Sequence, residues 1–124
     1  MKNMKIYLIF PTIIVIGLLS LSFLAYSELN IDAKPWSVVH FSTGDVYMGK
    51  ISHFPSFRLF DAYAVDFVQN TENPEDSSYK LIPIRETIWS PEFLEINSSE
   101  VIFYGQLTKE SDAYRALETA ENEL

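Results

Sequence analysis

The sequence predicts a mainly β protein, with an N-terminal transmembrane helix, a small five-stranded antiparallel β-barrel and a short C-terminal helix. Three observations support this fold class. The run Ile6–Tyr26 contains no charged residue. Between residues 36 and 108, short β-branched and aromatic runs alternate with turn-forming residues. From Ser111 to the end, the chain has strong helix formers and no helix breaker.

Residues 1–27 are predicted to form a membrane anchor. The uncharged run spans about 30 Å as a helix, which matches the hydrocarbon core of a bilayer. Lys2 and Lys5 precede the run, whereas Glu28 and Asp32 follow it. This charge asymmetry predicts a cytoplasmic N-terminus and an extracytoplasmic C-terminal domain.

A cleaved signal peptide is the alternative for the same segment. Ala25 and Ser27 are small residues, and they occupy the −3 and −1 positions of a possible cleavage site before Glu28. Secretory hydrophobic regions usually run about 7 to 15 residues, and this one is longer, which favours the anchor. In the alternative, the domain is secreted after cleavage.

A tether, residues 28–35, leads into the predicted barrel domain, residues 36–108. The runs Trp36–Phe41 and Val46–His53 predict a β-hairpin. Gly44 lies in its turn and supplies a backbone conformation that is closed to most residues.

The register of this hairpin decides which side chains reach the core. If Phe41 pairs with Val46, then Val39, Phe41, Val46 and Met48 share one side, which we expect to be buried. Gly49 follows, and we expect it to allow strong strand curvature or a close backbone approach.

The run Arg58–Val68 predicts a third strand. Its period-two pattern places four apolar residues on one face: Leu59, Tyr63, Val65 and Phe67. The opposite face is also apolar, and a strand of this kind belongs to a curled sheet or a barrel. Asp61 is the polar residue on the first face, so its carboxylate needs a hydrogen-bond partner.

Two further strands complete the predicted barrel. Tyr79–Arg85 is the fourth, and Pro83 puts it at an edge or a bulge because proline cannot donate to a strand ladder. Phe93–Ile96 reads as a short extension, and Glu100–Leu107 is the fifth strand.

Residues 109–124 are predicted to form the C-terminal helix. Ser111 is a suitable N-cap for it. A narrow apolar stripe follows at helical spacing: Ala113, Leu117, Ala120 and Leu124. We expect this stripe to close one end of the sheet.

Several sequence pieces, taken in order, resemble those of a known group of proteins. They are Val39–Ile51, Leu59–Tyr63, Pro91-Glu92, Ile96-Asn97 and Val101–Leu107. In this order they resemble a family of short single-pass bacterial membrane proteins, frequent in candidate-phyla genomes of the Patescibacteria type, with no assigned function. The Thr-Gly-x-x-Tyr-x-Gly hairpin is also similar to the first strand pair of SH3-like and Sm-like barrels. The resemblance implies such a barrel at the bacterial inner membrane and names no ligand.

Charge and composition exclude several kinds of function. From Glu28 onward the chain has 7 basic and 17 acidic residues, a net charge of −10. No nucleic-acid partner is therefore expected, although an Sm-like nucleic-acid binder remains the alternative function. The chain has no cysteine, and no phosphate-binding loop or activated-serine motif occurs.

The two histidines do not suggest a metal site. In the predicted hairpin, His40 lies beside Tyr47 whereas His53 lies well past Trp36, so their rings do not converge. We expect no catalytic residue, no cofactor and no metal, and we interpret the protein as a non-enzyme.

The aromatic content points to a binding surface. Three rings near the prolines of two turns form the candidate interaction surface: Phe57, Trp89 and Phe93. In the alternative, these rings pack over the ends of the barrel and stabilise it. The sequence thus predicts a membrane-anchored, extracytoplasmic, non-catalytic interaction module whose partner is an unknown protein or envelope component.

Overall fold

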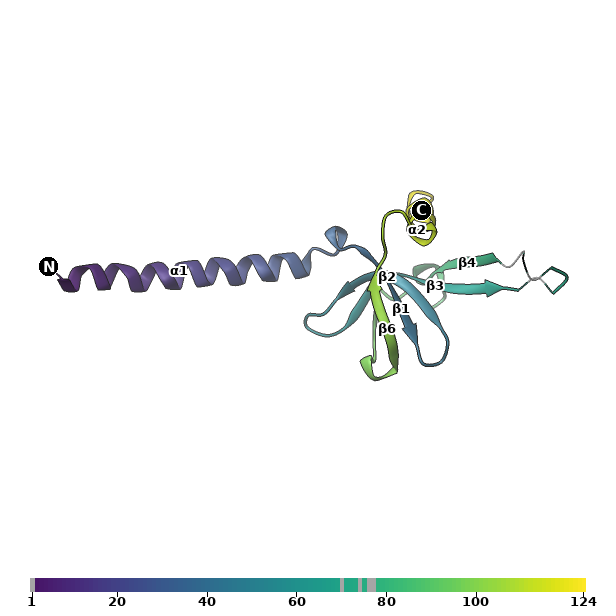
Figure 1. Ribbon diagram of the computed structural model, residues 1–124, viewed down its shortest axis with the longest axis horizontal. Helices are drawn as coiled ribbons and strands as arrows, with labels where there is room; N and C mark the ends of the chain where they lie inside the picture. Colours follow the sequence, from purple (N-terminus) through teal and green to yellow (C-terminus); the bar gives the residue numbers. More distant parts are fainter. Residues whose placement is uncertain (1, 70, 74, 76–77) are drawn as a thin grey trace. The chain divides into compact units, whose positions relative to one another are not determined.

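The computed structural model describes residues 2–69, 71–73, 75 and 78–124 (Figure 1). The chain divides into two compact units, Met1–Ala33 and Lys34–Leu124. The first unit is helical, and the second contains the β-sheet and the C-terminal helix.

Helix α1 spans Lys2–Leu29 and holds the uncharged run (Figure 1). Its segment Ile9–Tyr26 is long and apolar enough to cross a membrane. The hydroxyls of Ser20 and Ser22 each donate to the carbonyl oxygen four residues earlier, at 2.8 Å. These polar groups are therefore satisfied within the helix, as an apolar environment requires.

The tether predicted at residues 28–35 holds the last residues of α1 and a short 3₁₀ turn, η1 (Ile31–Ala33). Six residues separate the end of α1 at Leu29 from the first strand at Trp36. The side chains of the two N-terminal lysines, on which the predicted orientation depends, lie outside the described residues.

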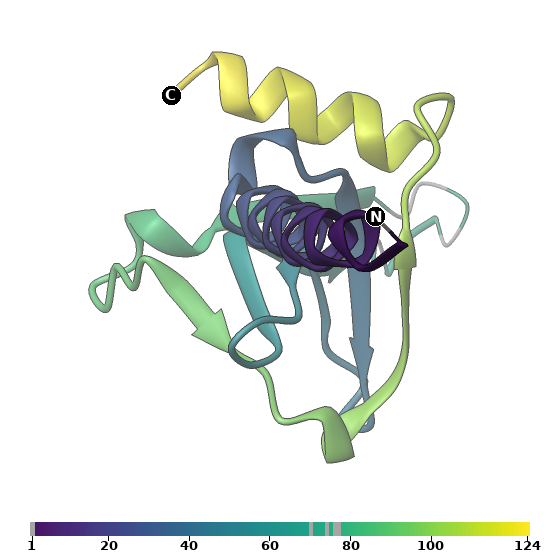
Figure 2. The same ribbon diagram turned by 90° about the vertical axis from the view of Figure 1, so that its left-hand side faces the viewer.

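The second unit is built on one antiparallel sheet of six strands (Figures 1 and 2). The strands are β1 (Trp36–Phe41), β2 (Val46–Ser52), β3 (Arg58–Val68), β4 (Ser78–Pro83), β5 (Phe93–Glu95) and β6 (Val101–Gln106). Their order is β4-β3-β2-β1-β6, and β5 also pairs with β3.

The prediction of five strands needs a correction at β5. The predicted short extension at 93–96 contains a separate strand that pairs with the first three residues of β3. The second half of β3 pairs with β4 instead. With 11 residues, β3 is long enough to pair with both β5 and β4, one after the other, along the edge that does not pair with β2.

The sheet does not close into a barrel. Across the described ranges, no strand ladder joins β6 to β4 or β5. Side chains approach across this opening, because Leu94 and Ile96 pack in the same cluster as Val101. The N–H of Ile96 donates to the carbonyl oxygen of Phe57, at 2.8 Å.

The turn between β1 and β2 has three residues, Ser42–Gly44. The N–H of Phe41 donates to the carbonyl oxygen of Asp45 at 2.9 Å, which makes these two residues the closing pair. Gly44 has a φ of +93°, and three-residue hairpin loops need a residue in the left-handed region at this point.

This turn shifts the hairpin register by one residue from the predicted pairing of Phe41 with Val46. Val46 pairs with His40 instead. Because neighbouring residues of a strand point to opposite faces, the shift separates Val39 and Phe41 from Val46 and Met48. The prediction that these four share one side is therefore wrong.

Strand β3 changes face at Asp61. This residue has a φ of +49°, and two residues of β3 lie opposite the single residue Gly49 of β2. The extra residue is a β-bulge. As a result Leu59 and Tyr63 pack on opposite faces of the sheet, and the uninterrupted alternation predicted for this strand is wrong.

Gly49 lets the two strands approach closely at the bulge. A Cβ atom at this position would lie 2.6 Å from the carbonyl oxygen of Phe60 and 2.8 Å from Cγ of Leu59. The first atom belongs to the backbone, which cannot move without disturbing the strand pairing. A side chain at Gly49 therefore has no room.

Apolar side chains pack on both faces of the sheet. One buried cluster contains Trp36, Met48, Tyr63 and Leu117. The other contains Val39, Ile51, Leu59 and Ala62. This two-sided burial agrees with the apolar character of both faces of β3.

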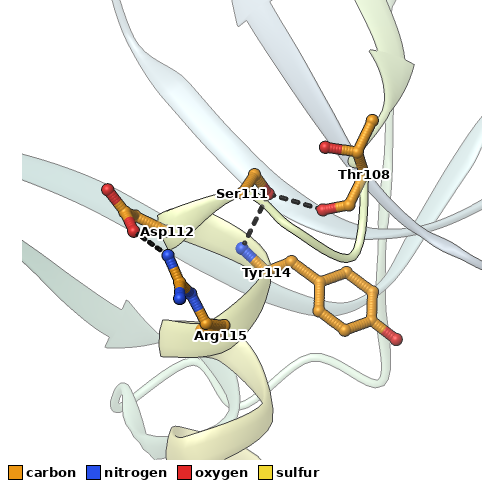
Figure 3. A network of polar contacts seen from close by, with 5 residues as sticks. All are labelled: Thr108, Ser111, Asp112, Tyr114 and Arg115. Carbon is orange, nitrogen blue, oxygen red and sulfur yellow. Dashed lines mark hydrogen bonds and ion pairs between the residues drawn. The ribbon is translucent and has the colours of Figure 1, made fainter.

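Helix α2 spans Asp112–Asn122 and covers the first cluster, with Leu117 fully buried (Figure 2). The Ser111 hydroxyl caps it by accepting from the N–H of Tyr114 at 3.2 Å and donating to the carbonyl oxygen of Thr108 at 2.7 Å (Figure 3). The helix is shorter than the predicted 109–124 because its cap lies at Ser111. Leu124, predicted in the apolar stripe, is exposed beyond its end.

Polar contacts also connect side chains along α2. Asp112 and Arg115 form an ion pair in the first turn (Figure 3). A hydrogen bond with the carboxylate of Glu118 raises the pKa of the Tyr114 hydroxyl above its usual value, and desolvation and the charges of Glu118 and Glu121 add to the rise.

Replacing Gly49 should destabilise the sheet. We expect Gly49→Ala to lower the free energy of unfolding by about 1 to 3 kcal/mol, because the new methyl group meets backbone atoms. Urea unfolding of the full chain in mild detergent, followed by tryptophan fluorescence, measures this. Gly105→Ala is the matched control, since a Cβ atom there meets no atom within 4 Å. Equal stability of the two variants would contradict the close approach.

Candidate interaction surface

Two rings of the β2–β3 connection meet a ring of β6, which lies far from them in the sequence. His53 follows β2, Phe57 precedes β3, and Tyr104 lies in β6. The ring centroids are 5.2 Å apart for His53 and Phe57, 5.2 Å for Phe57 and Tyr104, and 5.6 Å for His53 and Tyr104. With Ser98 and residues 101–103 they line a hollow of about 520 Å³, here called the β6 groove. This volume lies within the usual range of ligand pockets.

Local hydrogen bonds shape both sides of the β6 groove. The Ser52 hydroxyl donates to the carbonyl oxygen of Phe54 at 3.0 Å and accepts from its N–H at 3.4 Å, which turns the chain after β2. The Asn97 side chain caps the 3₁₀ turn η4 (Ser98–Glu100) that leads into β6. The Ser42 N–H donates to the last carbonyl oxygen of η4, at 2.8 Å, and so fixes the start of β6 against the β1–β2 turn.

Strand β6 lies at one end of the sheet, and its sequence does not protect that edge. The segment 101–107 contains neither a charged residue nor a proline. Three of its large side chains are exposed: Ile102, Phe103 and Tyr104. The opposite edge strand, β4, carries Lys80 and Pro83, which are common protections of a strand edge.

Backbone groups of β6 point away from the sheet. The N–H of Leu107 donates to the carbonyl oxygen of Trp36 at 2.8 Å. Because hydrogen-bonded and non-hydrogen-bonded pairs alternate along an antiparallel ladder, the N–H groups of Tyr104 and Gln106 point away from β1. Within the described residues, β6 pairs with β1 alone. These N–H groups are therefore available to a further strand.

The two histidines lie on opposite sides of β6. The His40 ring stacks on Phe103, with centroids 5.1 Å apart and planes 2° from parallel. Tyr104 follows Phe103 in β6, so its side chain points to the opposite face of the strand. There its ring contacts His53. Over the described ranges, no group of three or more His, Cys, Asp or Glu residues is placed to hold a metal ion.

The three rings of the predicted interaction surface have different surroundings. Phe57 lines the β6 groove. Phe93 packs against Phe60 with centroids 5.3 Å apart, and the Arg58 guanidinium lies 4.4 Å from its ring centroid. Trp89 lies in the loop between η3 (Ile84–Glu86) and β5 and is mostly exposed. The structure therefore does not join them into one surface.

A buried cation connects the sheet to α2. The Lys50 side chain is only 7% exposed, and its Nζ lies 3.4 Å from Oδ2 of Asp61 and 3.6 Å from Oε1 of Glu121. The same Nζ is 4.8 Å from the Trp36 ring centroid. The need of Asp61 for a partner was visible in the sequence. The burial of Lys50 was not, because it depends on the hairpin register.

A second hollow of about 280 Å³ lies beside the bulge, and its lining includes Asp61, Arg85 and Phe93. It is smaller than most ligand pockets. Asp61 already faces Lys50 there, so its carboxylate has a structural partner.

Comparison with models of protein families and with curated proteins finds no match to this sequence. The function is therefore inferred from the geometry of the surfaces of the domain.

Removing the charge of Asp61 should weaken the connection between the sheet and α2. Asparagine tolerates a positive φ, so Asp61→Asn removes the charge while keeping the bulge. We expect a loss of about 1 to 3 kcal/mol in the free energy of unfolding, since Lys50 stays buried with one carboxylate fewer. Glu110→Gln, an exposed change, is the control and should shift it by less than about 0.5 kcal/mol. Thermal or urea unfolding of both variants checks this. If Asp61→Asn leaves the free energy of unfolding unchanged, the ion pair does not stabilise the fold.

Proposed function

We propose that this protein is a membrane-anchored, extracytoplasmic, non-catalytic interaction module, which binds an extended segment of a protein partner at the β6 groove. One observation carries the proposal: an edge strand without charged or proline residues lies beside a groove lined by aromatic rings. Natural proteins usually protect such an edge, because it pairs readily with other chains.

Strand addition explains both features of the surface. The outward N–H groups of Tyr104 and Gln106 donate to the backbone of the incoming segment. Alternate side chains of that segment then enter the groove and pack against the rings of His53, Phe57 and Tyr104. Backbone pairing supplies affinity, and the groove supplies selectivity.

The charge of the domain favours a neutral or basic segment. The chain from Glu28 onward has a net charge of −10, which repels nucleic acid as well as acidic peptides. No observation on the β6 groove favours the Sm-like nucleic-acid binder. The groove is lined mainly by apolar and aromatic side chains, with the single histidine His53 and the hydroxyls of Ser98 and Tyr104 as its polar side-chain groups, and this composition supports a binding role.

The proposal places α1 across the bacterial inner membrane, with the N-terminus in the cytoplasm. The length and composition of α1 support a single span, and Lys2 and Lys5 support the orientation. We also propose that the protein belongs with the single-pass bacterial family that its sequence resembles, and that its sheet is related to SH3-like and Sm-like barrels. In such a barrel the opening beside β6 is the place where a partner strand fits. A secreted domain released by cleavage would keep the same groove.

Site-specific photo-crosslinking tests the binding surface. A benzophenone amino acid replaces Tyr104 in the full chain, expressed in membranes of the native host, and we expect irradiation to give one discrete protein adduct. The matched control places the same amino acid at Tyr79, an exposed tyrosine on the protected edge strand β4, and should give no such adduct.

A second variant separates strand addition from simple ring contact. Gln106→Pro removes one outward N–H and should abolish the adduct at position 104, while thermal unfolding reports whether the fold is retained. Adducts of equal yield at positions 79 and 104, or a crosslink to RNA, would contradict the proposal.

A further inference from the structure

A second exposed feature lies away from the β6 groove, in the loop between η3 and β5. Ile88 and Trp89, here called the 88–89 tip, are 88% and 80% exposed. Neither residue belongs to the two buried clusters or lines the β6 groove. Figure 2 shows the loop that holds them projecting from the strands.

The loop around the tip is ordered by its own hydrogen bonds. The Thr87 hydroxyl donates to the carbonyl oxygen of Ile84 at 2.6 Å, and the N–H of Ser90 donates to the carbonyl oxygen of Thr87 at 3.1 Å. Ser90 has a φ of +37° and precedes Pro91, which restricts the chain further. The two apolar side chains are therefore held out in water, at a free-energy cost that burial against an apolar phase would remove.

We propose that the 88–89 tip inserts into the interfacial layer of the same bilayer that α1 spans. This inference rests on the membrane anchoring in the proposed function. Tryptophan is enriched where headgroups meet acyl chains, because its ring is apolar and its indole N–H can hydrogen-bond. A neighbouring isoleucine adds apolar area on the acyl side.

The short connector keeps the domain close to the bilayer that α1 is proposed to span. Six residues join α1 to β1, and because three of them form the turn η1, the connector reaches at most the roughly 20 Å of six extended residues. A domain of this size has a radius of gyration of about 12 Å, so the connector lets it turn any face to the bilayer. Tethering also raises the effective concentration of the surface to the order of millimolar, at which a weak contact is populated.

The chemistry of the tip indicates an apolar contact. Arg85 and Glu86 precede it and Glu92 follows it, so no basic cluster is present in this part of the sequence. The net charge of the domain also opposes attraction to anionic headgroups. Insertion should therefore occur in zwitterionic lipid and be nearly independent of salt.

The two tryptophans of the chain make the test direct. Trp36 is 4% exposed within the domain, whereas Trp89 is the ring of the tip. The full chain is reconstituted in vesicles of phosphatidylcholine brominated on its acyl chains, which quenches nearby indole rings. We expect a severalfold fall of the Trp89 emission relative to ordinary phosphatidylcholine. Trp89→Phe, which leaves Trp36 alone, should show little change.

Two further measurements keep the proposal falsifiable. Ile88→Ser retains the reporter ring and should reduce the quenching by lipid, while acrylamide quenching from the water phase increases. Flotation of the vesicles is measured in parallel. If the chain floats but Trp89 is quenched by acrylamide and not by the brominated lipid, the tip faces water or a protein, and this inference alone fails. If the chain does not float with the vesicles, the anchoring fails and the inference fails with it.

Discussion

The close approach of β2 and β3 at Gly49 is the constraint on which the rest of the domain depends. There the missing side chain lets the backbone of Phe60 come within 2.6 Å of where a Cβ would stand. Asp61 takes up the extra residue opposite, with a positive φ. The extra residue of the bulge shifts the alternation of side chains along β3. Leu59 before the bulge and Tyr63 after it are therefore buried on opposite faces of the sheet.

The two faces that result have different coverings. Helix α2 covers one of them through Leu117, and the buried Lys50 connects that helix to the bulge through Glu121 and Asp61. The other face is covered by side chains that approach across the opening of the sheet, and no described ladder closes it. The exposed edge of β6 borders this opening, and the β6 groove lies beside the same strand.

Much of the fold was predictable from local sequence patterns. The apolar run predicted α1, and the turn residues around Gly44 predicted the hairpin of β1 and β2. The helix formers after Ser111 predicted α2. The register was not predictable, because two turn lengths fit the same residues and only the left-handed Gly44 selects the three-residue loop. The segment 93–96 was predicted as a short extension and not as a separate strand, because three residues carry too little periodicity to identify a strand.

The candidate site was predictable only in part. Phe57 and Trp89 were identified as surface rings, but their different surroundings depend on tertiary packing. Phe57 contacts His53 of the same connection and also Tyr104 of β6, and the contact with Tyr104 was not predictable because the two residues lie far apart in the sequence. The missing protection of β6 was visible as an uncharged run, although it becomes informative only once the strand is known to be an edge.

Residue-resolved amide hydrogen exchange of the purified full chain measures whether the edge of β6 is open. We expect fast exchange at Tyr104 and Gln106, whose N–H groups point outward, and slow exchange at Phe103 and Gly105, whose N–H groups point toward β1. Equal and strong protection at all four amides would show that the edge of β6 is already covered and is not open to a partner strand.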